Sequence, residues 1–202
     1  MKIFIIRHGK TPGNALGKYI GRTDESLSDE GKALAAALKK NKDVSEVFVT
    51  PLRRTAETAA ILFPNAVQTV VDDLREMDFG DFENRNYKDM ENDEAYRAWV
   101  EAQCVPPCPG GEDMNGFADR CAEGFKEVIA ALKRAGKENA VFVVHGGTIM
   151  SLNYVFLRPR VPYYEQTIKN CCGFSYTLGD GDNEQPFTLT ERKPIEGGDF
   201  TF

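Results

Sequence analysis

Two short apolar runs, each ending in a His-Gly pair, constrain the fold of this chain more than any other feature. Ile3-Phe4-Ile5-Ile6 leads into Arg7-His8-Gly9, and Ala140-Val141-Phe142-Val143-Val144 leads into His145-Gly146-Gly147. Runs of this length, rich in β-branched residues and cut by glycine, are typical of strands buried on both faces. Such strands need helices on either side, and α/β proteins bind ligands beyond their carboxyl ends. The only two histidines of the chain are therefore expected to share one crevice.

The rest of the pattern predicts one α/β domain over residues 1–202, since a chain of this length can bury a full core. Residues 9–26 are expected to form a long loop, and the last few residues a tail. Further strands are expected at 47–49, 68–71, 174–178 and 187–190. Two helices are expected to begin at recognisable caps. The first follows Ser28, ends at about 39–41 and has Leu34, Ala35 and Leu38 on one face; the second has Thr50 as its cap and Pro51 as its first residue and ends at about Phe63. Further helices are expected over 88–103, after the loop that ends at Gly111 and up to Gly136, and from Thr148 to Leu157.

Charge and cysteine content exclude several classes of protein. The net charge is −6 and the sequence pI about 5.1, which argues against a nucleic-acid or anionic-membrane partner. No apolar run approaches membrane-spanning length, and the N-terminal run is not a signal peptide. Five cysteines, an odd number, predict reduced thiols and a cytoplasmic protein. Cys104 and Cys108 are spaced like zinc ligands, but no second pair accompanies them, so no metal is expected.

The helix expected after Val49 breaks a local rule. Its first turn carries Arg53 and Arg54, although cations at a helix N-terminus oppose the helix dipole by up to about 1 kcal/mol each. An arginine that points into solvent would explain one of the two, but less readily both. A broken rule without visible compensation indicates a functional site.

The polar residues at strand ends and helix starts suit a phosphate group. They are Arg7, His8, Arg54 and His145, with Glu76 on a nearby loop. Guanidinium forks match phosphate oxygens, and the helix that follows His145 offers free N–H groups to an anion. Each histidine could instead merely cap a core strand, and Glu76 could be a surface ion-pair partner.

His8 and Glu76 would make such a site catalytic. A neutral imidazole, with an ordinary pKa of about 6.5, can attack phosphorus and form a covalent intermediate. The leaving alkoxide then needs a proton, which a carboxylic acid can supply if its pKa is raised. Met77 and Phe79 are apolar neighbours that could raise the pKa of Glu76.

Five blocks in this order resemble the histidine phosphatase superfamily, in its phosphoglycerate-mutase-like branch. Arg7-His8-Gly9-x-Thr11 is similar to the family's Arg-His-Gly-Glu-Thr signature, and Thr50-Pro51-Leu52-Arg53-Arg54 to its second block, in which Arg54 rather than Arg53 aligns with the phosphate-binding arginine. Leu74-x-Glu76-x-x-x-Gly80 resembles the block of the proton donor. Pro109-Gly110-Gly111-Glu112 and Val144-His145-Gly146-Gly147 complete the set.

The resemblance implies a three-layer α/β sandwich with a mostly parallel central sheet, helices on both faces, and no metal or cofactor. It implies that His8 is phosphorylated, that Glu76 donates the proton, and that Arg7, Arg54 and His145 hold the phosphoryl oxygens. The binding residues that it implies in addition are Asn14, the Gly21 backbone, Gly146 and Thr11. The partner would be a small-molecule phosphomonoester, and a homodimer stays open.

Departures from the family pattern bear on the substrate. Lys10, Gly13, Asn84 and Asp113 stand where many members carry Glu, Trp, Gly and Ser. The segment 85–108 lacks the Arg-Arg pair of phosphoglycerate mutases, so hydrolysis is favoured over transfer to another hydroxyl. The segments 21–24 and 76–81 are most similar to α-ribazole-phosphate phosphatases. A mutase and a non-catalytic phosphate sensor are the alternatives.

Overall fold

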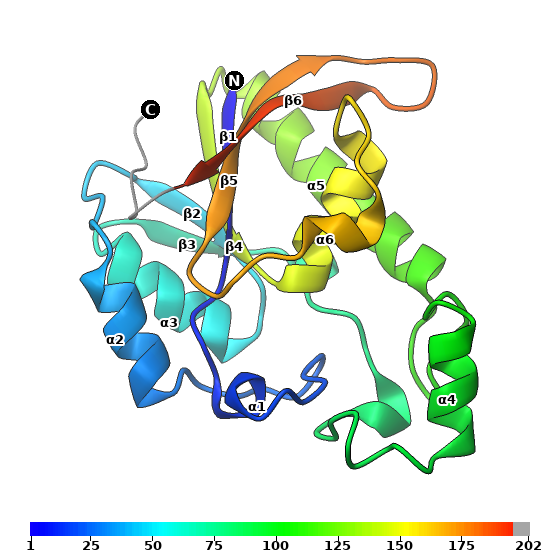
Figure 1. Cartoon of the computed structure of the whole chain (residues 1–202). Helices are drawn as coiled ribbons and strands as arrows, with labels where there is room; N and C mark the ends of the chain where they lie inside the picture. The colour runs from blue at the N-terminus through cyan, green and yellow to red at the C-terminus, as the bar shows by residue number, and fades with distance from the viewer. Residues whose placement is uncertain (196–202) are drawn as a thin grey trace.

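The strand predicted near the N-terminus, β1 (Lys2–Arg7), lies inside a six-stranded sheet in the computed structural model, which describes residues 1–195 (Figure 1). The strand order is β3-β2-β4-β1-β5-β6. The neighbours β3, β2, β4 and β1 run parallel to one another. β5 runs antiparallel to β1 on one side and to β6 on the other. The other strands are β2 (Glu46–Val49), β3 (Val67–Val70), β4 (Asn139–Val144), β5 (Gly173–Asp180) and β6 (Phe187–Ile195).

Helices cover both faces of this sheet, which confirms the predicted three-layer fold (Figure 1). Alternate residues of β1 serve the two faces: Phe4 and Ile6 pack in one apolar cluster, Ile3 and Ile5 in the other. The first cluster includes α3 (Arg53–Leu62), and α2 (Asp29–Ala37) packs on α3. The second includes α5 (Met114–Arg134) and α6 (Gly146–Phe156). Burial of each large apolar side chain stabilises the fold by about 1.5–3 kcal/mol.

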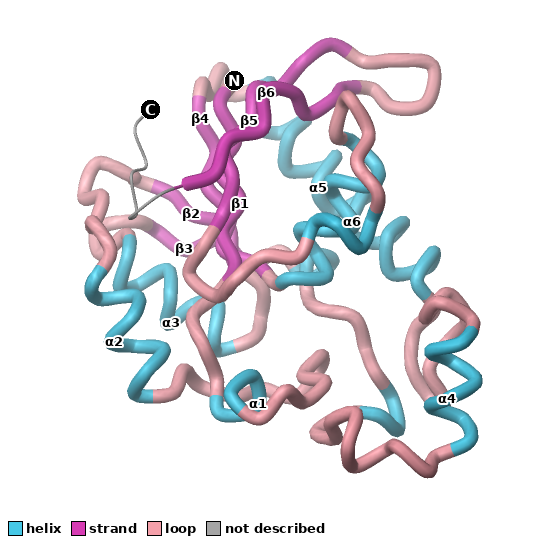
Figure 2. The backbone as a smooth tube through the Cα atoms, viewed as in Figure 1, coloured by secondary structure: helices cyan, strands magenta, loops and turns pink. Residues whose placement is uncertain are grey.

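An aromatic cap lies beyond the carboxyl ends of the parallel strands, where Figure 2 shows mostly loops. It contains α4 (Glu94–Glu101) and the short helices η1 (Asp72–Leu74) and η2 (Gly80–Phe82). Another short helix, η3 (Tyr163–Gln166), follows α6. The Trp99 ring of α4 lies 5.8 Å from the ring of Tyr19 and 5.5 Å from that of Phe82. The cap therefore joins the loop after β1 to the segment after β3.

Several predicted boundaries are wrong. α3 begins at Arg53 with Leu52 as its N-cap and no side-chain cap. The Thr50 hydroxyl accepts from the Leu52 N–H at 3.4 Å, and it bonds more closely to His145 Nε2 at 2.9 Å. The loop 9–26 contains a short helix, α1 (Pro12–Ala15), and α2 ends at Ala37 with Leu34 exposed. The helix predicted over 88–103 is confined to α4, and α6 starts two residues earlier than predicted. The predicted tail lies outside the described residues. Within them, no helix combines the length and the apolar character needed to cross a membrane.

Candidate active site

The two histidines meet because β1 and β4 are neighbouring parallel strands. Arg7 is in register with Val144, and the His8 N–H donates to the Val144 carbonyl at 2.9 Å. The two imidazole centroids lie 5.2 Å apart, and both side chains are buried. The two histidines thus lie together, as predicted, at the carboxyl ends of the central strands, the edge at which this class of sheet binds ligands.

The His8 ring is held in one tautomer. Its Nδ1 lies 2.7 Å from the Gly9 carbonyl oxygen, which can only accept a hydrogen bond, so Nδ1 carries the proton. Nε2 therefore keeps its lone pair. Burial, followed by the charges of Arg54 and Arg7, lowers the pKa of His8 well below its ordinary value. The imidazole is consequently neutral and able to act as a nucleophile.

Arg7 offers an unused donor beside this ring. One terminal nitrogen donates to the Ile168 carbonyl at 2.6 Å, whereas the buried Nε has no hydrogen-bond partner among residues 1–195. A buried donor without a partner costs about 1–3 kcal/mol. Gly146 lies against the same guanidinium, because a Cβ there would be 3.4 Å from it. An anion bound at this point would satisfy the orphaned donor.

Arg54, the fully buried member of the arginine pair, ties three segments together. Its Nε donates to His145 Nδ1 at 3.2 Å, and its terminal nitrogens donate to the carbonyls of Thr23 and Gly21 at 2.8 and 2.7 Å. His145 Nε2 must then carry the proton, which it donates to the Thr50 hydroxyl at 2.9 Å. Burial and the charge of Arg54 lower the pKa of His145 as well. Arg53, in contrast, is exposed.

Glu76 belongs to the loop between η1 and η2, and its carboxylate lies beside the first residues of α6. Its Oε2 accepts from the Gly147 N–H at 3.0 Å, and its Oε1 from the Met77 N–H at 3.1 Å. Any side chain at position 147 would collide with the carboxylate, because a Cβ would lie 2.3 Å from Oε1. Burial raises the pKa of Glu76, although these two bonds and the nearby arginines oppose the shift. The surface ion-pair alternative does not describe this half-buried carboxyl, because its oxygens accept from backbone N–H groups.

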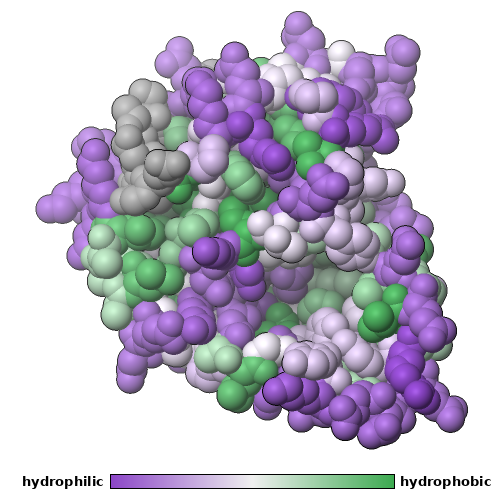
Figure 3. Space-filling view, in the orientation of Figure 1, coloured by the Kyte–Doolittle hydropathy of each residue, from purple (hydrophilic) through white to green (hydrophobic). Residues whose placement is uncertain are grey.

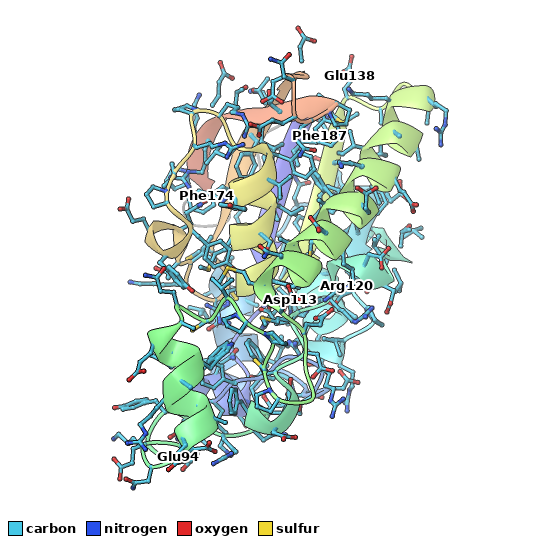
Figure 4. The ribbon with its side chains drawn as sticks, turned by 90° about the vertical axis from the view of Figure 1, so that its right-hand side faces the viewer. Glu94, Asp113, Arg120, Glu138, Phe174 and Phe187 are labelled. Carbon is cyan, nitrogen blue, oxygen red and sulfur yellow. The ribbon has the colours of Figure 1, made fainter. Side chains whose placement is uncertain are left out.

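Arg120 and Glu112 hold the segment that carries Glu76. The Arg120 side chain forms hydrogen bonds of 2.8 Å with both Glu112 carboxylate oxygens and with the Asp73 carbonyl. Arg120 lies on the part of α5 nearest Asp113 in Figure 4. The sequence reasoning did not assign this arginine to the site, since its role depends on a contact between helix and loop that no local pattern signals.

The remaining predicted binding residues, Asn14, Thr11 and Gly21, differ in whether their polar groups are already used in hydrogen bonds within the protein. Asn14 accepts from Asn170 Nδ2 at 3.2 Å, and that amide also donates to the His8 carbonyl at 3.1 Å. Thr11 is buried and caps α1 through the Asn14 N–H. The Gly21 N–H donates to Glu83 Oε1 at 3.0 Å and so is not free for an anion.

Besides Arg120, three further residues contribute to the site without having been predicted there, namely Thr50, Glu83 and Asn170. Thr50 carries the one signal that could have suggested a role, because it immediately precedes the Pro51 of the second block. In residues 1–195, no cluster of three or more His, Cys, Asp or Glu side chains could hold a metal ion.

The chain is similar in sequence to known proteins. A sequence profile of the histidine phosphatase superfamily (branch 1) matches residues 3–185. Phosphoglycerate mutase-like protein 4 of Arabidopsis thaliana is 33% identical over 191 residues, which cover 90% of this chain and 81% of the relative. The adenosylcobalamin/α-ribazole phosphatase of Salmonella typhimurium is 29% identical over 160 residues, 75% of this chain and 77% of the relative.

A solved structure shows the same fold. The crystal structure of the α-ribazole phosphatase from Shigella flexneri superposes with a TM-score of 0.76 at 23% identity, and 94% of each chain is covered. The phosphoglycerate-mutase-like arrangement of sheet and helices is thus shared along nearly the whole chain.

Proposed function

The chain belongs to branch 1 of the histidine phosphatase superfamily, and from this membership we propose that it hydrolyses a small-molecule phosphomonoester through a phosphohistidine on His8. The observation that carries the proposal is the neutral His8 Nε2 beside an Arg7 Nε that has no hydrogen-bond partner within residues 1–195. Attack on a phosphoryl group requires a nucleophile and, next to it, a cationic donor that can stabilise the phosphoryl oxygens.

The first step forms a bond from His8 Nε2 to phosphorus and breaks the bond to the ester oxygen. Glu76, kept protonated by its raised pKa, gives its proton to the departing oxygen. In the second step the Glu76 carboxylate takes a proton from water, whose oxygen attacks phosphorus and displaces His8. Phosphate leaves, and Glu76 is protonated again.

Arg7, Arg54 and His145 would stabilise the charge on the phosphoryl oxygens, with Gly146, Asn14 and Thr11 at the edge of the site. Arg54 can do so only if an anion competes for some of the hydrogen bonds that it now makes to Gly21, Thr23 and His145. The Gly21 N–H is left out of this assignment because Glu83 occupies it.

Hydrolysis is favoured over phosphoryl transfer between hydroxyls. The segment between η2 and α5, which includes α4 of the aromatic cap, lacks an Arg-Arg pair for a substrate carboxylate. The Salmonella relative supports α-ribazole phosphate as one substrate to test. The mutase is the second candidate because the Arabidopsis relative is named phosphoglycerate mutase-like. A non-catalytic sensor would not need both His8 and Glu76.

A substrate panel tests the proposal. We expect release of inorganic phosphate from at least one ester among α-ribazole phosphate, phosphoserine, sugar phosphates, nucleotides and phosphoglycerates, with chelator-resistant turnover of an aryl phosphate. Robust isomerisation of 3-phosphoglycerate in a reaction primed with 2,3-bisphosphoglycerate would favour the mutase instead. Phosphate binding without turnover of any ester would favour the sensor.

The neighbouring arginines provide a matched pair of variants. We expect Arg54→Ala to lower kcat/KM by about 100- to 1,000-fold, because a buried donor to the phosphoryl group is lost. Arg53→Ala should change kcat/KM less than about 5-fold, since its exposed side chain makes only a 3.8 Å ion pair with Glu57. Thermal unfolding of both variants checks that the fold persists. Equal losses at the two positions would contradict the assignment of Arg54.

We also propose a cytoplasmic location, because all five cysteines are free thiols. A homodimer remains a proposal, and sedimentation of the purified protein would decide it.

A further inference from the structure

An apolar cavity of about 310 Å³ opens beside Glu76. Its wall is mostly aromatic or sulfur-bearing, and Figure 3 shows hydrophobic surface in the recess between α6 and α4. The lining residues that matter here are Tyr19, Phe79, Trp99, Phe117, Met150 and Tyr163. The rings of Tyr19 and Phe79 lie 5.1 Å apart, which is a favourable distance for an aromatic pair.

This wall carries no lysine or arginine among the described residues. Glu76 is its one acidic group, and burial raises the pKa of Glu76, of Tyr163 and of the Cys104 thiol, so all three groups favour their neutral forms. The Arg120 guanidinium lies 5.2 Å from the centre of the Phe117 ring, but it already pairs with Glu112. An anionic substituent in this cavity would therefore lose hydration without meeting a cation in the wall, which is a large penalty.

A second cavity on the Arg7 side has the opposite character. It measures about 540 Å³, and its lining includes the cations Arg7, Lys18 and Lys169. Two cavities thus adjoin the site: a cationic lobe lined by Arg7 and an uncharged lobe lined by Glu76. Which lobe holds the alcohol portion of the ester decides the class of substrate.

The position of the acid selects the uncharged lobe. Glu76 must lie within hydrogen-bond reach of the ester oxygen that it protonates. Attack by His8 is in line with that oxygen, so the leaving group lies on the side of Glu76 rather than on the side of Arg7. The alcohol portion then extends from Glu76 into the cavity that Glu76 itself lines.

We propose that the substrate is a phosphomonoester whose alcohol is uncharged and carries an aromatic ring seated among Tyr19, Phe79 and Met150. This inference rests on the proposed phosphatase function and names the substrate class. A cavity of about 150 Å³ holds benzene, so the volume beside Glu76 has room for a ring and a substituent. Carboxylate-bearing alcohols such as glycerate are excluded from this lobe by the lack of a cation.

Two esters of nearly equal size test the proposal: 4-methylphenyl phosphate and 4-carboxyphenyl phosphate. The carboxyphenol is the better leaving group, so intrinsic reactivity favours the charged ester. We expect the enzyme to reverse this order, with kcat/KM at least about 10-fold higher for the methyl ester, because the carboxylate would be buried unpaired. Equal values, or a preference for the charged ester, would overturn the proposal.

Variants locate the preference in the molecule. Met150→Lys adds a cation to the lobe and should reduce the preference at least about 10-fold, whereas Met150→Leu should keep it. Val100→Lys, which adds the same charge on the exposed side of α4, should leave the ratio unchanged. A ratio that responds to Lys18→Met or Lys169→Met but not to Met150→Lys would place the leaving group in the cationic lobe and refute the inference.

The outcomes also separate this inference from the function on which it rests. Turnover of other phosphomonoesters without turnover of either aryl ester would overturn the inference alone. Absence of turnover with every ester would overturn the proposed phosphatase function, and the inference with it.

Discussion

Replacement of His8 by asparagine is expected to lower kcat on every phosphomonoester by at least about 1,000-fold, as removal of a catalytic nucleophile does in other enzymes. Asparagine keeps a donor that can reach the Gly9 carbonyl, which His8 Nδ1 now contacts at 2.7 Å. It has no nitrogen with a free lone pair to replace Nε2. The loss should therefore be chemical rather than structural, and initial rates with an unchanged melting temperature would show this.

Trapping of the covalent intermediate provides the complementary measurement. The wild-type protein, quenched in alkali during turnover, should carry one phosphoryl group on the peptide that contains His8. The His8→Asn protein should carry none. A His8→Asn protein with full turnover, or a phosphoryl group on another residue, would contradict the assignment of the nucleophile.

Replacement of Glu76 by glutamine should produce the second largest loss, and the loss should depend on the leaving group. With an alkyl phosphate we expect kcat to fall by about 100- to 10,000-fold, the usual contribution of a general acid. With 4-nitrophenyl phosphate, whose phenolate leaves without a proton, phosphorylation of His8 should be much less affected. A burst of nitrophenolate followed by slow turnover would show that the second, base-assisted step has become limiting.

The pH dependence of kcat follows from the two shifted groups. The lowered pKa of His8 keeps the nucleophile neutral to more acidic pH than a free imidazole, so activity is lost only when the pH falls through that lowered value. The raised pKa of Glu76 keeps the acid protonated to higher pH than a free carboxyl, so activity declines as the pH rises through it. With an alkyl phosphate, the alkaline limb should disappear in Glu76→Gln. An alkaline limb that persists would assign it to another group.

The sequence predicted the elements that are periodic or buried on both faces. The strands that lead into His8 and His145 and the long helix α5 follow from local residue types. The contrast between Arg53 and Arg54, in comparison, rests on the family resemblance. Even the missing cap of α3 agrees with the idea that its N-terminus gives up local stability for the site.

The hydrogen-bond network could not be predicted in the same way. The pattern at Thr50 predicts a helix cap, because threonine before proline usually is one, yet its hydroxyl bonds to His145, which is distant in sequence. The family resemblance implies that the Gly21 backbone binds phosphate, but Glu83 occupies the Gly21 N–H. Both contacts depend on how loops fold over the sheet, which local propensity does not determine.

The place of β1 in the sheet affects how the enzyme matures on the ribosome. This strand leads into His8, the proposed nucleophile, and is synthesised before both of its sheet neighbours, β4 (Asn139–Val144) and β5 (Gly173–Asp180). Non-local pairing of this kind delays formation of a structure until the later segments are available. His8 must wait for them, so a nascent chain that stops before β4 should be inactive, and the appearance of activity should mark completion of the sheet.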